Sequence, residues 1–146
     1  MQRARATMAE VGGEAETEPL DDVQRALLER YVDAFERYDV EGLVGLLHED
    51  ATQHMPPFVM WLRGRADIGT WMLGPGAKCR GSRVLATLAN GAPAFAQYRP
   101  AAGGGHEPWA LHVLEVRAGR VAHISSFLDL DNDLFRRLGL PVEPPV

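Results

Sequence analysis

Cysteine is almost absent from this sequence, since Cys79 is the only one among its 146 residues. A chain with one cysteine cannot form an internal disulfide, and such usage is typical of a reducing compartment. No apolar run approaches the roughly 20 residues that a membrane-spanning helix needs, and the N-terminus has no apolar core of the secretory type. These absences predict a soluble, cytoplasmic protein without a membrane anchor.

Basic residues are also fewer than acidic ones. The chain has 15 Lys and Arg against 20 Asp and Glu, which gives a formal net charge of −5. Because a nucleic-acid-binding surface is normally basic, this balance argues against direct nucleic-acid binding by the main body of the chain. No metal or other cofactor is predicted, because the five histidines lack the spacing of a metal site; they are His48, His54, His106, His112 and His123.

The composition that remains is that of an ordinary globular domain, with 46% hydrophobic and 24% charged residues. Residues 9–19 (AEVGGEAETEP) are acidic and nearly free of large apolar groups, which is typical of a linker. We therefore expect residues 1–20 to form a helical remnant and linker, residues 21–140 to form the domain, and residues 141–146 to form a C-terminal tail.

Helical spacing dominates the first half of that domain. Residues 20–39 (LDDVQRALLERYVDAFERYD) predict an amphipathic helix that Asp21 or Asp22 can cap. The next stretches predict a second helix at 40–50, a short strand at 51–58 that two prolines end, and a third helix at 63–73.

The period of the sequence then changes to that of strands. Four strand-like runs are predicted, at residues 82–90, 92–100, 107–117 and 119–129, and a short helix follows at 131–139. Tight-turn signals separate the first pair and the last pair. The order predicts an α+β fold in which helices cover one face of a curved sheet that contains a four-stranded antiparallel meander.

Two stretches, LLERYVDAFERYDVEGLVGLLHEDAT (27–52) and RGRADIGTW (63–71), resemble the nuclear transport factor 2-like superfamily. Its members include SnoaL-like polyketide cyclases and ketosteroid isomerases, and the resemblance covers residues 21 to about 138. It implies a cone-shaped, strongly bent antiparallel sheet that wraps around N-terminal helices and encloses a pocket. This fold hosts enzymes, binding modules and dimerisation domains, so the fold alone does not give the activity.

A more specific resemblance runs through loops as well as core positions. MPPFVMWLRG (55–64), GPGAKCRGSR (74–83), APAFAQYRP (92–100) and GGGHEPWALHVLEVRAGRVAHISSFLD (103–129) resemble the C-terminal SnoaL-like domain of one group of bacterial extracytoplasmic function (ECF) sigma factors. There the domain follows two sigma domains that bind DNA and polymerase. The resemblance implies the sigma-factor core domains and RNA polymerase as partners.

The opening MQRARATM (1–8) is similar to the end of the DNA-reading domain in those sigma factors. Residues 1 to about 18 are accordingly expected to make few contacts with the body. The chain alone lacks the helical sigma domains, so we do not expect it to act as a sigma factor by itself.

The resemblance also locates the positions that an isomerase would use. Tyr31 falls where ketosteroid isomerases keep their oxyanion tyrosine, and His112 falls at their second donor. The position of the catalytic base is Met55, which cannot accept a proton at neutral pH. His54 is one residue away on a strand and should point to the opposite face. The isomerase mechanism therefore lacks its essential group, and no catalytic residue is predicted.

Strand alternation, together with the resemblance, predicts a mostly apolar cavity inside the cone. Such a cavity suits a small, largely apolar ligand. The same side chains could instead simply fill the cone as core. The predicted lining is Tyr31, Met55, Trp61, His112, Leu114, Ile124 and Ser126.

Two weaker candidates lie outside this cavity. Cys79 has basic neighbours in sequence, which would lower the pKa of an exposed thiol, but an incidental loop cysteine is the simpler interpretation. A cluster of basic residues is either solvated surface or a docking face for an acidic partner or the acidic linker; its members are Arg63, Arg65, Lys78, Arg80 and Arg83.

Together these observations predict a non-catalytic regulatory domain of the ECF sigma-factor type, which modulates transcription initiation and could respond to a small apolar ligand. The alternative is a small isomerase, cyclase or hydratase that acts on a polyketide- or steroid-like substrate through Tyr31, His112 and an unidentified base. A homodimer is compatible with either function.

Overall fold

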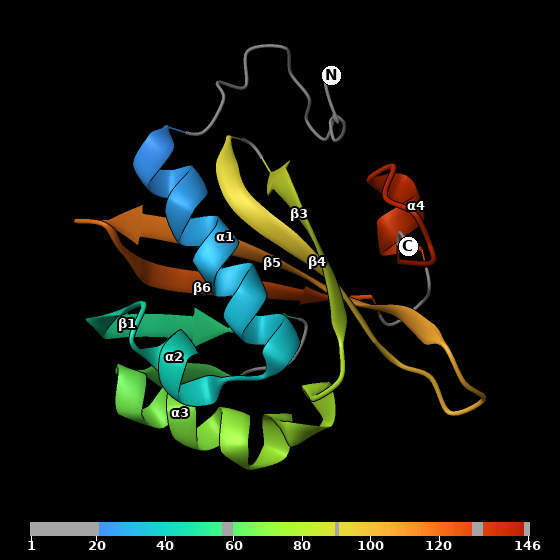
Figure 1. Cartoon of the computed structure of the whole chain (residues 1–146), viewed down its shortest axis with the longest axis horizontal. Helices are drawn as coiled ribbons and strands as arrows, with labels where there is room; N and C mark the ends of the chain where they lie inside the picture. The colour runs from blue at the N-terminus through green and yellow to red at the C-terminus, as the bar shows by residue number, and fades with distance from the viewer. Residues whose placement is uncertain (1–20, 57–59, 90, 130–132, 145–146) are drawn as a thin grey trace.

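The computed structural model describes residues 21–56, 60–89, 91–129 and 133–144 (Figure 1). The expected remnant and linker at residues 1–20 lie outside the described residues. Within the described part of the chain, no helix is both long enough and apolar enough to cross a bilayer.

The first helix, α1 (Asp22–Arg37), forms where helical spacing predicts it. The Asp21 carboxylate accepts a hydrogen bond from the Gln24 backbone N–H at 2.7 Å, and the Gln24 side chain accepts one from the Asp21 N–H at 3.2 Å. This capping box satisfies two N–H groups that a helix start leaves unpaired. The buried face of α1 carries Leu27, Leu28, Tyr31, Ala34 and Phe35.

The next segment differs from the prediction. Helix α2 covers only Val40–Val44, and residues 47–50, which the sequence predicts as helical, belong to strand β1 (Leu47–His54). Gly42 and Gly45 weaken a helix here, and pairing with the rest of the sheet extends β1 toward the N-terminus. The edge strand β2 (Trp61–Arg63) is not predicted at all, because three residues are too few to show a period of two.

The remaining elements follow the predicted order, except that the 3₁₀-helix η2 (Pro75–Cys79) is not predicted. The predicted ones are α3 (Arg65–Leu73), β3 (Arg83–Ala89), β4 (Ala92–Pro100), β5 (His106–Arg117), β6 (Arg120–Leu128) and α4 (Leu134–Arg137). The turn between β5 and β6 places Ala118 and Gly119 at φ 55° and 75°, and two successive positive φ angles are what a two-residue type I′ hairpin turn requires.

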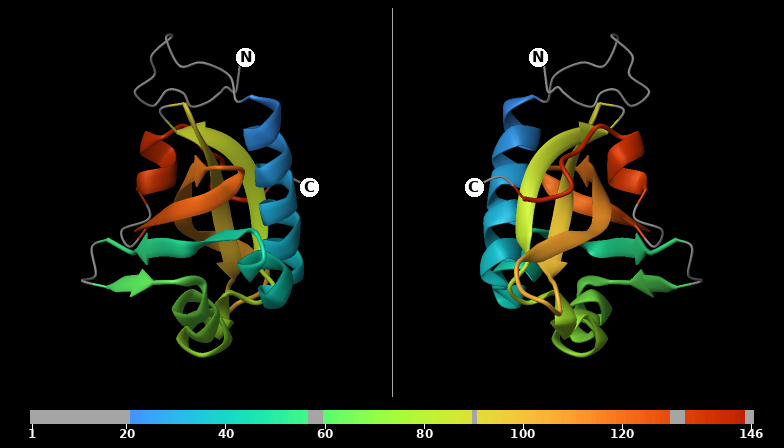
Figure 2. Two further views of the ribbon diagram at one scale, coloured as in Figure 1. Left: turned by 90° about the vertical axis from the view of Figure 1, so that its left-hand side faces the viewer. Right: turned by 90° about the vertical axis from the view of Figure 1, so that its right-hand side faces the viewer.

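All strands join one six-stranded sheet in the order β2-β1-β6-β5-β4-β3. Strands β3 to β6 form the predicted antiparallel meander. Strand β1 lies parallel to β6 and antiparallel to β2, so the sheet is mixed. It curves around α1, as the two side views show (Figure 2), which confirms the α+β fold with a bent sheet around an N-terminal helix.

The helices lie on both faces of this sheet, and not on one as the sequence predicts. The inner face packs against α1, α2 and α3 and contains Phe95, Leu114 and Ile124. On the outer face, α4 buries Phe135 against Tyr98 and Leu111. Figure 2 shows α1 and α4 on opposite sides of the sheet. A four-residue helix has too short a pattern to reveal which face it covers.

Candidate functional site

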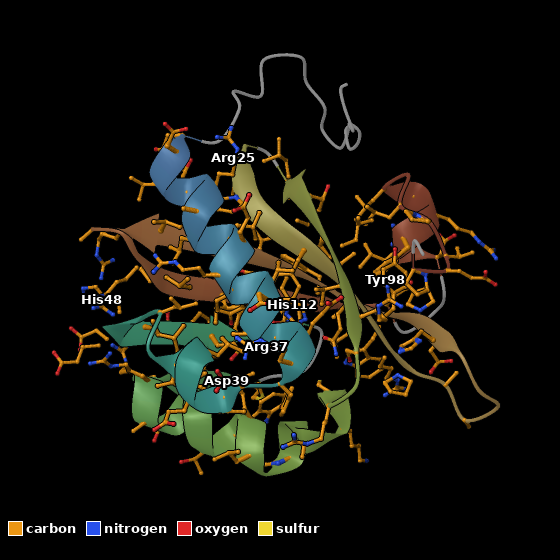
Figure 3. All side chains as sticks on the ribbon, in the orientation of Figure 1. Arg25, Arg37, Asp39, His48, Tyr98 and His112 are labelled. Carbon is orange, nitrogen blue, oxygen red and sulfur yellow. The ribbon has the colours of Figure 1, made fainter. Side chains whose placement is uncertain are left out.

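A chain of buried polar side chains crosses the inner face of the sheet, with His112 at its centre. Figure 3 labels His112, which lies beneath α1. The His112 ring contacts the Ser126 hydroxyl through Nδ1 at 2.8 Å and the Gln97 carbonyl oxygen through Nε2 at 2.7 Å. Gln53 donates to Ser126 at 3.1 Å, and Gln97 donates to Ser82 at 3.0 Å. The chain thus joins strands β1, β6, β5 and β4 to the start of β3.

The direction of these hydrogen bonds fixes the state of His112. Because the Gln97 oxygen accepts, His112 Nε2 carries the proton and donates, and Nδ1 accepts from the Ser126 hydroxyl. Burial lowers the pKa of His112 to about 3, since a low-dielectric interior disfavours the imidazolium. His112 is therefore a neutral ring with both nitrogens occupied by protein partners.

Beside this network lies a small cavity of about 20 Å³. Its lining includes Tyr31, Met55, Trp71, Trp109 and His112. A volume of this size holds one or two water molecules and leaves no room for a steroid or a polyketide. Where the described residues line it, the interior of the cone is therefore mostly filled by side chains.

Tyr31 is one of the polar residues of this lining that the network does not use. It is 2% exposed and packs against Phe95 at 5.5 Å between ring centroids. Burial, and secondarily the neighbouring Tyr38, raise the pKa of Tyr31, so it stays protonated at any physiological pH. Among the residues that the structure describes, none forms a hydrogen bond with its hydroxyl.

The structure places the predicted lining residues in three ways. Tyr31, Met55 and His112 line the cavity. The others on the inner face are buried behind that lining and fill the core; they are Leu114, Ile124 and Ser126. Trp61 lies elsewhere: it is 66% exposed on the outer face and stacks on His54 at 4.8 Å, so its predicted place in the cavity is wrong.

Sequence reasoning missed two members of the network: Gln53, which is one of its ends, and Gln97, which connects His112 to Ser82 at the other end. A signal was present, because each occupies an inward position on its strand between apolar inward neighbours, such as Met55 after Gln53 and Phe95 before Gln97. A glutamine at such a position needs a buried partner. Its partner is across the sheet and far away in sequence, so spacing alone does not identify it.

The residue at the position of the isomerase base is Met55, and its side chain faces the inside of the cone as the sequence predicts. Met55 faces the inner side and is 8% exposed, whereas His54 lies on the outer face against Trp61 and His123. The structure brings no carboxylate into the cavity lining within the described residues. The titratable groups of the lining are the phenols of Tyr31 and Tyr38, the thiol of Cys79 and the neutral imidazole of His112. Burial raises the pKa of the first three and lowers that of His112, so none of these groups has a pKa near neutral pH, where a general base works best.

Comparison with known proteins shows which family the chain belongs to. Residues 28–124, more than half of the chain, match the family described as SnoaL-like domain. The chain belongs to the SnoaL-like domain family.

The same SnoaL-like domain is similar to the ECF RNA polymerase sigma factor SigG of Mycobacterium tuberculosis (strain ATCC 25618 / H37Rv). The two are 38% identical over an alignment of 146 positions, and this alignment covers 97% of this chain and 39% of SigG. The chain thus spans well under half the length of the curated relatives that it matches.

Solved structures share the fold. The SnoaL-like domain matches the ECF sigma factor SigJ of Mycobacterium tuberculosis with a TM-score of 0.60 and 22% identity, over 84% of this chain and 47% of SigJ. It matches an NTF-2 like protein from Burkholderia xenovorans LB400 with a TM-score of 0.62 and 18% identity, over 85% of this chain and 88% of that protein. At such identities the similarity shows the fold alone.

Cys79 of the SnoaL-like domain is not the activated thiol that its basic sequence neighbours would produce. It lines the cavity, and burial raises its pKa more strongly than the Gln97 hydrogen bond and the Arg99 charge lower it. A thiol with a raised pKa is a poor nucleophile at neutral pH.

The basic residues near α3 do not form one patch. Arg80 lies over the Tyr38 ring at 5.0 Å, and Arg83 pairs with Glu36 at 3.7 Å. Arg63 lies on the outer face of the sheet, beside Thr52. Among the described residues, no group of three or more His, Cys, Asp or Glu is placed to hold a metal ion.

Proposed function

We propose that this protein is a non-catalytic regulatory domain of the ECF sigma-factor type, which modulates transcription initiation by packing against the helical sigma domains in the cytoplasm. The observation that carries the proposal is the 38% identity to SigG across 97% of the chain. An identity at this level over nearly the whole chain extends through surface loops, which diverge faster than a shared core.

The interior supports a non-catalytic role. General acid–base catalysis needs a group whose pKa lies near the working pH and that can reach the reacting atom. His112 has a pKa of about 3, and both of its ring nitrogens are bonded to Ser126 and Gln97. Met55 occupies the position where the isomerases keep their base.

A ligand for this domain is small and largely apolar. The cavity of about 20 Å³ takes more than one or two water-sized groups only if Met55, Trp71 or Trp109 moves. Methionine rotates easily between conformations, so the Met55 side chain is the element that can move with least cost. The Tyr31 hydroxyl is the hydrogen-bonding group that such a ligand would meet.

In vitro transcription tests the regulatory proposal. With core RNA polymerase and a SigG-dependent promoter, the chain alone should give no transcript. Added to the sigma domains of SigG produced without the matching region, it should change the transcript yield. The NTF-2 like protein from Burkholderia xenovorans, at the same concentration, is the control for a non-specific effect of the fold. Initiation by the chain alone, or an unchanged yield in both mixtures, would contradict the proposal.

A second candidate is a small isomerase, cyclase or hydratase, which the unpartnered Tyr31 hydroxyl at the cavity favours. A thermal-shift screen of small phenols, ketones and steroids, followed by Tyr31→Phe and His112→Ala variants of any responder, separates the functions. Turnover that collapses in both variants establishes an enzyme. Binding without turnover, lost in Tyr31→Phe, establishes a sensor.

A further inference from the structure

The outer face of the sheet carries a cluster of exposed rings on strands β2, β1 and β6. Trp61 stacks on His54 with ring centroids 4.8 Å apart, His54 lies 5.0 Å from His123, and Phe127 meets His54 edge-on at 6.5 Å. Trp61 is 66% and Phe127 38% exposed. We call Trp61, His54, His123 and Phe127 the aromatic patch.

Two opposite charges border this patch along one row of the sheet. The strand registers pair Arg63 with Thr52, Thr52 with His123, and His123 with Glu115. Directly paired residues share a face, so Arg63 lies at one end of the row and Glu115 at the other. Both side chains are exposed, and no salt bridge to either is formed within the described residues.

The middle of the patch is held rigid. The Thr52 hydroxyl and His123 Nδ1 are 2.6 Å apart, and His123 Nε2 is 3.0 Å from His54 Nδ1. These bonds fix both rings, and the His54 ring in turn supports the indole of Trp61. A partner that binds here orders few side chains, which lowers the entropic cost of association.

Another part of the same face is already covered by a helix, α4. On the neighbouring strands, helix α4 inserts Phe135 against Tyr98 with the ring planes at 89° and against Leu111. Leu111 pairs with Phe127 in the register, so the strip that α4 covers continues directly into the uncovered aromatic patch.

The dimensions of the uncovered part suit one helix. Arg63 and Glu115 are three strand intervals apart, which is about 14 Å at the usual strand spacing, and an α-helix with its side chains is about 10–12 Å across. From His123 to Phe127 the patch extends along β6 by four residues, which is about 13 Å, so it covers on the order of 200 Å². Each partner of a stable homodimer of standard size buries about 800 Å², which is several times that area.

We propose that the aromatic patch is the surface on which one amphipathic helix of the sigma domains docks. The helix places an apolar ridge over Trp61 and Phe127, an acidic residue near Arg63 and a basic residue near Glu115. This inference rests on the proposed function, because it names the surface by which the domain meets its sigma partner.

Binding in trans tests the surface. The partner is the part of SigG outside the matched region, checked first for helical circular dichroism, and affinity is measured by calorimetry with the full 146-residue chain. Trp61→Ala should weaken binding at least tenfold, which is about the loss expected for a central tryptophan. Leu73→Ala is the matched control, because Leu73 is 65% exposed on α3 and its removal should leave affinity unchanged.

Charge-reversal variants provide a second test of the docking surface. Arg63→Glu and Glu115→Arg should each weaken binding about threefold to tenfold, and the double variant should bind more weakly than either. Unchanged affinity in Trp61→Ala and in both reversals would overturn the surface while leaving the proposed function standing. No binding by the wild-type chain would overturn the proposed function itself.

A second copy of this chain is the competing occupant, and the charge row distinguishes it. In a face-to-face dimer with its two-fold axis along the strands, between β1 and β6, Arg63 of each copy meets Glu115 of the other. Sedimentation would then show a dimer that either single reversal breaks and the double reversal restores. That result would overturn the helix-docking proposal.

Discussion

His112 shows how one buried residue can be polar without being reactive. Its ring lies at the centre of a chain of hydrogen bonds in which Ser126 and Gln97 satisfy both nitrogens. A satisfied buried network stabilises one arrangement of the strands, whereas the same groups without partners would be costly. At this position the sheet uses an imidazole to connect strands.

Removal of the ring should therefore affect stability strongly. His112→Leu keeps a side chain of similar size but leaves the Gln97 oxygen and the Ser126 hydroxyl without their partner, at about 1–3 kcal/mol each. We expect the free energy of unfolding in urea to fall by about 2–6 kcal/mol. His48→Leu, at a partly exposed histidine, is the control and should change it by less than about 0.5 kcal/mol. Equal effects of the two changes would contradict the network's structural role.

The pKa of His112 gives stability a defined dependence on pH. Its pKa falls from 6.5 to about 3 on folding, so between these values the unfolded chain binds a proton that the folded chain does not. The free energy of unfolding is therefore highest above pH 6.5. It decreases as the pH falls below that value, by up to about 1.4 kcal/mol per pH unit. Burial lowers the pKa of His123 as well, which acts in the same direction.

Urea unfolding at pH 7.0, 6.0 and 5.0 measures this dependence, with His112→Gln as the comparison, because carboxylates also titrate in acid. As the pH falls, the free energy of unfolding of the wild type should decrease more steeply than that of the variant. The difference in slope should correspond to the uptake of close to one proton on unfolding. Parallel curves for the two proteins would show that the pKa of His112 does not change on folding.

The candidate site could be predicted from sequence only in part, and the reason lies with single residues. Strand alternation placed His112 and Met55 on the inner face and His54 on the outer face. It could not exclude Trp61 from the cavity, because Trp61 belongs to a three-residue strand whose register only the partner β1 fixes. The two hydrogen-bond partners of His112, Ser126 on β6 and Gln97 on β4, lie on other strands, so local spacing does not identify them.

At the scale of elements, the long segments with a strong period are the predictable ones. Helix α1 and the meander from β3 to β6 fall within the expected ranges, because local pattern and tertiary packing agree there. Helix α2 and β1 depart from expectation because Gly42 and Gly45 weaken a helix that apolar spacing alone favours. Helix α4 forms as predicted but covers the opposite face, which depends on how residues beyond β6 turn back over the sheet.

Although it is short, α4 is expected to matter to stability, because Phe135 is fully buried at 0% exposure. Phe135→Ala removes the ring that packs against Tyr98 and should lower the free energy of unfolding by about 3–5 kcal/mol. Val142→Ala, at a side chain that is 42% exposed, serves as the comparison and should be close to neutral. A loss below 1 kcal/mol in Phe135→Ala would mean that α4 detaches at little cost.

At the scale of the whole molecule, the described part of the chain starts with the capping box that Asp21 and Gln24 form at α1. This cap satisfies two of the N–H groups that a helix start leaves unpaired. We therefore predict that removal of residues 1–20 leaves the free energy of unfolding within about 0.5 kcal/mol of the full chain. Chemical denaturation of both forms measures this, and a larger loss would show that the first segment belongs to the domain.

The parallel pairing of β1 with β6 also has a consequence for how the domain is made. Thr52 and His123 meet across 71 positions of sequence, so β1, whose local partner is only the three-residue β2, cannot join the meander until β6 has been synthesised. The meander can form from local hairpins, but closing a loop of this length is slow. During translation the apolar face of β1 therefore stays exposed until β6 emerges, and a chaperone would protect the nascent chain in that interval.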